Sequence, residues 1–78
     1  MSIDRKLYVH AFMELVDEII KENRDNPERA KKLIVEEVLR EARKVFRLED
    51  YQEIKMYAFR KLMELGFSAK ELEELLEK

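Results

Sequence analysis

The chain contains a single glycine, and it lies where one helix should end and another begin. Within residues 64–72, Gly66 can take the left-handed backbone conformation that closes a helix. Ser68 is placed to cap the helix that follows, and Glu71, three residues later, completes the pattern of a capping box. The segment therefore predicts a corner between two helices, with its polar residues engaged in capping rather than in chemistry.

Strong helix formers make up most of the remaining sequence. Glu, Lys, Leu, Arg and Ala are abundant, whereas the chain has one proline, no cysteine and no tryptophan. A length of 78 residues suits one domain, so we expect a single helical domain over residues 1–78. Without cysteine there is no disulfide framework, and the apolar runs are far shorter than the roughly 20 residues of a membrane-spanning helix. We therefore expect a soluble, cytoplasmic protein that does not contact a membrane.

Four amphipathic helices are predicted, each with apolar residues three and four positions apart. They cover about residues 3–22, 27–46, 51–65 and 69–77. Short loops place successive helices side by side and antiparallel. The expected fold class is all-α: a compact four-helix bundle with a short fourth helix, antiparallel neighbours and short loops.

The helix starts are predicted from capping residues. Ser2 is the expected cap of the first helix. Asn26 is placed to cap the second helix, with Pro27 at the first helical position, where its missing N–H is not needed. The boundary between the second and third helices has neither glycine nor proline, and only Asp50 with Glu53 marks a new start there by a capping box.

The sequence offers no group of residues suited to catalysis. Both serines, Ser2 and Ser68, stand at predicted caps, so no activated nucleophile is left. His10 and Glu14 lie about one helical turn apart, but a zinc site needs three or four ligands, and the chain has no second histidine and no cysteine. We therefore expect no catalytic residue, no metal site and no cofactor.

A row of basic residues at the end of the second helix is the best candidate for binding an anion or a nucleic acid. The row consists of Arg40, Arg43, Lys44 and Arg47. Acidic residues interrupt the same helix, namely Glu36, Glu37 and Glu41, and the net charge of the chain is -2, from 16 basic and 18 acidic residues. A nucleic-acid surface needs clustered positive charge. We therefore expect no nucleic-acid binding, and the row is typical of basic residues that complement a helix dipole.

Residues 59–76 resemble two natural motifs, the Leu-Gly-Phe-Ser corner of MerR-type transcription regulators and the Met-Gly-Phe loop of ubiquitin-associated domains, in which Leu65 here replaces the methionine. A glycine cap followed by a hydrophobic staple and a capping box accounts for both similarities without kinship. Taken whole, the chain resembles de novo designed helical bundles, because its glycine, proline and serines all stand at helix boundaries and cysteine is absent. His10, Gln52 and Tyr57 are more typical of natural helical fragments, from which such a design can be assembled.

Two hypotheses of function follow. The first, implied by the resemblance, is a designed structural domain that folds and has no native ligand and no required partner. The second is a small interaction module that binds a partner helix in an apolar groove. A domain that only folds should expose no large contiguous apolar surface, whereas a binding module should expose one that charged residues surround. We expect a monomer, with a homodimer as the alternative.

The unequal helix lengths indicate where an interaction would occur. If the short fourth helix covers one end of the bundle, the opposite end keeps only three helices. We expect an apolar interaction surface at that open end, formed by Leu7, Val9, Phe46, Met56 and Tyr57. The alternative is that tilted helices close this end.

Overall fold

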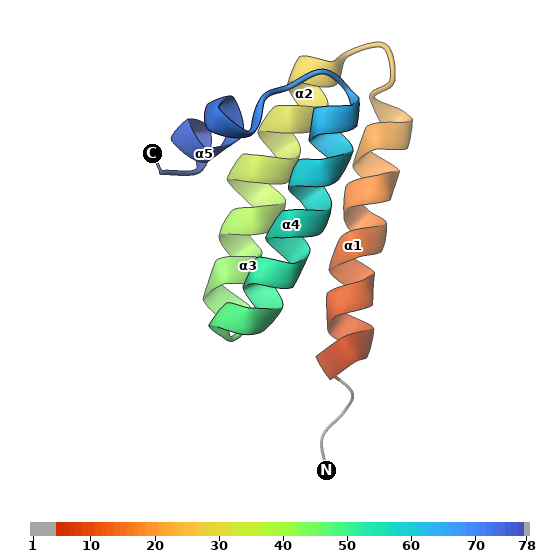
Figure 1. The fold of residues 1–78 in the computed structure, drawn as a ribbon. Coiled ribbons are helices and arrows are strands. Elements are labelled where there is room, and N and C mark those ends of the chain that lie inside the picture. The colour runs from red at the N-terminus through yellow and green to blue at the C-terminus, as the bar shows by residue number, and fades with distance from the viewer. Residues whose placement is uncertain (1–4, 78) are drawn as a thin grey trace.

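The computed structural model describes residues 5–77, and this part of the chain forms four continuous helices and no strand (Figure 1). The second helix is unbroken but contains a π-helical segment, η1, between two α-helical parts. The bounds are α1 Arg5–Glu22, then α2 Pro27–Leu33, η1 Ile34–Leu39 and α3 Arg40–Val45 in one helix, then α4 Leu48–Glu64 and α5 Ala69–Glu77. The predicted all-α four-helix bundle with a short last helix is confirmed. The predicted cap at Ser2 lies outside the described residues.

The core lies between α1, the α2–η1–α3 helix and α4. The segment η1 is central, because it contacts α1, α4 and α5. Buried apolar side chains come from every helix, and the largest fully buried ones are Ile34, Leu39, Ile54, Leu62, Leu72, Val16 and Val35. In Figure 1, α5 lies beside α2, far from the first turn of α1. Within residues 5–77, no helix combines the length and the apolar character needed to cross a bilayer.

The corner predicted around Gly66 is confirmed. Gly66 has a φ of 112°, in the region that strains any residue with a Cβ atom. Two backbone hydrogen bonds close α4 around it. The Gly66 N–H donates to the carbonyl of Met63 at 3.0 Å, and the Phe67 N–H donates to the carbonyl of Leu62 at 3.3 Å. These two hydrogen bonds form a Schellman motif, the helix C-terminus that usually has a glycine directly after the last turn.

Ser68 caps α5 as predicted, since its Oγ accepts a hydrogen bond from the Glu71 N–H at 3.1 Å. The Glu71 carboxylate, however, accepts from Lys31 Nζ of α2 at 3.1 Å instead of forming the second half of a capping box. The Lys31 ammonium also lies 4.9 Å from the ring centre of Phe67. Hydrogen bonds to Glu28 and to Glu71 raise the pKa of Lys31 above its usual value, although burial opposes them. One lysine therefore fastens the corner to α2.

Two substitutions test the corner. Gly66→Ala is expected to lower the free energy of unfolding by about 1 kcal/mol. The space around the position is open, so the loss comes from backbone strain and not from a clash. Ser68→Ala is expected to cost about 0.5–2 kcal/mol through the lost cap. Thermal denaturation followed by circular dichroism measures both. Gly66→Asn is the control, because asparagine tolerates the left-handed conformation and should lose less than alanine; identical melting of Gly66→Ala and the parent would contradict this account.

The predicted cap at Asp50 is wrong. The helix α4 begins earlier, and Arg47 occupies its N-cap position without a side-chain hydrogen bond. Phe46 and Arg47 have extended backbones, so only two residues join α3 to α4. The Phe46 ring packs edge-on against Phe12 of α1, with ring centres 5.0 Å apart, and this contact fixes the turn. Asp50 lies in the first turn of α4, where the helix dipole favours a carboxylate, 3.8 Å from Arg5 of α1.

The segment η1 follows from an unusual apolar spacing in the second helix. Apolar residues stand at every fourth position, namely Ala30, Ile34, Val38, Ala42 and Phe46. In a continuous α-helix, each step of four residues rotates such a row by about 40°, so the row would leave the core after a few steps. A π turn contains one extra residue and rotates the following residues back by about 100°. The row can therefore stay inside, and its first four members are buried.

Val45 shows the same effect in reverse. In a continuous α-helix, Val45 would follow Ile34 and Val38 on the same apolar face, but it is exposed. The extra residue in η1 turns Val45 away from the core. On α1, the apolar row Val9, Met13, Val16 and Ile20 includes the buried residues Val9 and Val16, whereas Leu15 of the neighbouring row remains 44% exposed.

Candidate functional site

The residues predicted to form one surface at the open end of the bundle lie in different environments. Val9 is 4% exposed, because it belongs to the face of α1 that packs into the core, so its assignment to a surface is corrected. Phe46 is half-buried against α1. Leu7 on α1 and Met56 on α4 are exposed, at 64% and 70%. Met56 and Tyr57 are adjacent in α4 and therefore lie about 100° apart around it. The structure does not bring Met56 and Tyr57 onto one face.

Tyr57 instead fastens α4 to α1. Its hydroxyl donates to the Asp17 carboxylate, with distances of 2.7 Å to Oδ2 and 2.9 Å to Oδ1. Lys61 Nζ lies 3.9 Å from the same carboxylate and 5.4 Å from the centre of the Tyr57 ring. Burial, together with the hydrogen bond to Asp17, raises the pKa of Tyr57 above its usual value. These contacts give Tyr57 a structural role between two helices.

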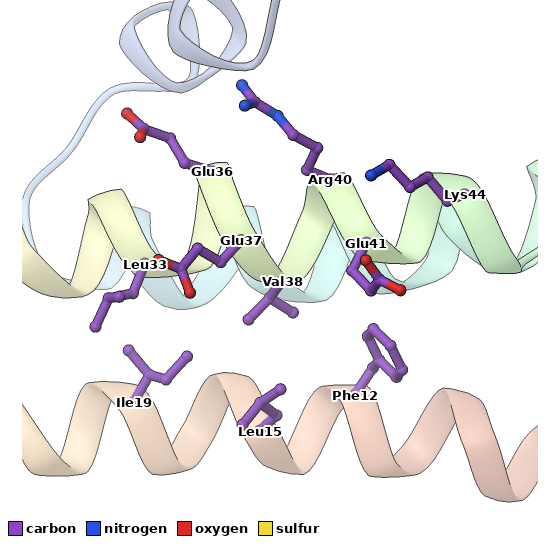
Figure 2. Close-up of a pocket in the computed structure, with 10 residues that line it drawn as sticks. All are labelled: Phe12, Leu15, Ile19, Leu33, Glu36, Glu37, Val38, Arg40, Glu41 and Lys44. Atoms are coloured by element: carbon purple, nitrogen blue, oxygen red, sulfur yellow. The ribbon is translucent and has the colours of Figure 1, made fainter.

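A groove of about 560 Å³ runs between α1 and the α2–η1–α3 helix (Figure 2). Figure 2 shows apolar side chains of the two helices facing one another across it. These side chains are Phe12, Leu15 and Ile19 from α1, and Leu33 and Val38 from the opposite helix. The three α1 residues span two helical turns, or about 10 Å at 1.5 Å per residue. The groove therefore presents a continuous apolar strip made by two facing helices.

Carboxylates line the edge of the groove that η1 and α3 form. In Figure 2, Glu37 and Glu41 point from this helix toward α1. Of the other charged lining residues, Glu36 and Arg40 extend to the side of the helix away from α1, and Lys44 lies along α3. The cations of the helix therefore do not cover the apolar strip.

On α1, two carboxylates follow the apolar residues of the groove, and Lys21 shares the surface hollow of the first of them. Glu18 shares a shallow surface hollow with Leu15. Glu22 follows Ile19 by three residues and so lies on the same side of the helix. Within residues 5–77, no ion pair involves any of the four edge carboxylates, which are Glu18, Glu22, Glu37 and Glu41. The groove is thus an apolar strip with carboxylates on both of the helices that form it.

Met56 lines a second surface hollow, of about 530 Å³, together with Phe59 and Met63. All three apolar residues belong to α4, whereas two facing helices form the first groove. The hollow is also bounded by Lys55, whose Nζ already lies 3.1 Å from the Glu73 carboxylate of α5. The groove beside α1 is therefore the stronger candidate site.

The remaining candidates from the sequence are placed at the surface. His10 is exposed on α1. Within residues 5–77, no three His, Cys, Asp or Glu side chains gather closely enough to hold a metal ion. In the basic row, Arg40 and Lys44 border the groove, while Arg47 lies beyond the end of α3 and 3.9 Å from Glu49. The row is therefore not one continuous helical face.

Local sequence patterns do not identify the groove, because its α1 residues belong to an apolar row that core packing explains equally well. The available signal is that α1 carries two adjacent apolar rows, more than its neighbours cover. No protein-family model matches this chain, and no match was found among curated proteins or among solved structures.

Proposed function

We propose that this chain is a small interaction module whose groove binds one amphipathic helix of a partner protein. The observation that carries the proposal is the apolar strip between α1 and the α2–η1–α3 helix, with charged residues along its edges. Exposed apolar surface with a charged rim is typical of protein-binding sites.

The spacing of the strip fits a helix as the ligand. Phe12, Leu15 and Ile19 follow one another by three and four residues, and a helix that docks in a groove uses anchors at the same spacing. A partner helix lying along α1 would bury the exposed part of Leu15, which contributes roughly 1 kcal/mol or more. The partner would pack as one more helix against the bundle.

A designed domain whose purpose is to fold is the competing proposal. Its support is the regularity of the helix boundaries: Asn26 Oδ1 accepts from the Arg29 N–H at 3.2 Å, and the Gly66 corner has the geometry expected of it. Against it stands the number of large apolar side chains on the surface, which designed surfaces keep low. These are Leu7, Tyr8, Leu15, Val45, Leu48, Met56, Met63 and Leu65.

A titration with a helical probe peptide tests the interaction module. The peptide carries leucines at positions i, i+3 and i+7 on one face and uncharged glutamines along both flanks. Added to the ¹⁵N-labelled protein, it is expected to shift the amide resonances of residues 12–19 and 33–44 in a saturable manner. Leu15→Gln is expected to weaken binding about tenfold, because it removes apolar surface from the strip.

The matched control is Leu7→Gln, which makes the same chemical change on the same helix outside the groove. It should leave the affinity unchanged. The proposal fails if the peptide shifts no amide at millimolar concentration, or if the two substitutions weaken binding equally. Either result would favour the domain that only folds.

A further inference from the structure

We infer that the partner helix carries lysine or arginine along both flanks of its apolar face. The inference rests on the proposed function and adds the charge of the partner to it. Glu37 and Glu41 line the groove, Glu18 and Glu22 follow its apolar residues on α1, and none of the four has an ion pair within residues 5–77. A basic flank on each side of a docked helix would meet the carboxylates of one groove helix.

Three other helix contacts of the described chain each have a carboxylate of one helix paired with a cation of the other. The pairs are Arg5 with Asp50 and Lys61 with Asp17 between α1 and α4, Lys55 with Glu73 between α4 and α5, and Lys31 with Glu71 between α2 and α5. Between α1 and the α2–η1–α3 helix, the described residues form no such pair. Of the nearby cations, Arg40 extends away from α1 and Lys44 lies along α3 (Figure 2). The carboxylates of Glu37 and Glu41 therefore point into the groove without a cation of α1 paired to them.

The charges also disfavour other occupants. An acidic helix would bring like charges together along both edges, and so would a second copy of this chain that docked with its own groove. Each exposed pair adds little by itself, but several carboxylates beside an apolar groove attract a basic helix and raise its association rate. Added salt reduces this attraction, because it screens exposed charges.

Three peptides with one apolar face test the inference. They carry lysine, glutamine or glutamate along both flanks and are otherwise identical. At low ionic strength, the lysine peptide is expected to bind about tenfold more tightly than the glutamine peptide, and the glutamate peptide more weakly than both. The advantage of the lysine peptide should shrink at about 0.5 M salt. Isothermal titration calorimetry measures all three affinities.

Two matched double variants test whether the carboxylates of the groove cause the tighter binding of the lysine peptide. Glu37→Gln combined with Glu41→Gln should reduce the advantage of the lysine peptide to about threefold or less. Glu53→Gln combined with Glu74→Gln removes the same charge from exposed positions outside the groove and should leave the advantage intact. The double variant Glu37→Lys with Glu41→Lys should bind the glutamate peptide more tightly than the parent does.

The outcomes separate this inference from the proposed function. Equal affinity for the three peptides overturns the basic partner and leaves the interaction module standing. Binding of none of them overturns the interaction module. An equal loss in both glutamine double variants shows that only net charge matters, and it overturns the assignment to the edge carboxylates.

Discussion

The substitution Leu39→Ala is expected to lower the free energy of unfolding by about 2–5 kcal/mol. Leu39 is fully buried in η1, the segment that contacts α1, α4 and α5, so the cavity would open where three helices meet. A domain of this length has a net stability of roughly 4–12 kcal/mol. The variant should therefore lose a large share of its stability, with a melting temperature lower by about 10 °C or more.

Urea denaturation followed by circular dichroism measures this loss. The control is Leu7→Ala, the same change of side chain at a position that is 64% exposed. It should stay within about 0.5 kcal/mol of the parent. A loss for Leu39→Ala as small as that of the control would show that η1 is not the centre of the core.

Deleting Met56 is expected to unfold the domain, whereas deleting Glu37 is not. Both residues are exposed and lie inside helices. The buried residues of α4 follow α-helical spacing on either side of Met56, with Ile54 before it and Ala58 after it. Loss of one residue there rotates one half of the helix by about 100° against the other, so one half leaves the core.

Deleting Glu37 should leave the domain folded, because the π-helical segment η1 contains one residue more than an α-helical segment of the same length. The shortened segment can become α-helical while Ile34 and Ala42 keep their places in the core. Far-ultraviolet circular dichroism and thermal melting of both deletion variants check the contrast. If the Glu37 deletion unfolds the protein as fully as the Met56 deletion, the extra residue is not what η1 accommodates.

The helices and most of their boundaries could be predicted because local signals set them. Pro27, Gly66 and Ser68 act through their own backbones or through neighbours a few residues away, and the structure has them as expected. The start of α4 could not be predicted in this way, because it depends on the contact of Phe46 with Phe12 on another helix. The regular spacing of four in the second helix contains the signal for η1, but it is easily taken for an ordinary amphipathic pattern.

The individual residues of the candidate site could be recognised in the sequence, but their arrangement could not. The apolar row of α1 is visible in the sequence, but whether Leu15 ends in the core or at a groove depends on how far apart two helices pack. Taken one at a time in the sequence, Glu37 and Glu41 are typical of solvated surface charges. Only the structure shows that both point toward the apolar side chains of α1 (Figure 2).

The ends of the chain are held by contacts between residues far apart in sequence. Tyr57 meets Asp17, and Lys31 meets Glu71, each pair being 40 positions apart. The middle of the chain differs, because only two residues join α3 to α4. Closing a short loop costs less conformational entropy than closing a long one. The hairpin of residues 27–64 has the shortest of the three connections, so we expect it to form first and α1 and α5 to dock onto it afterwards.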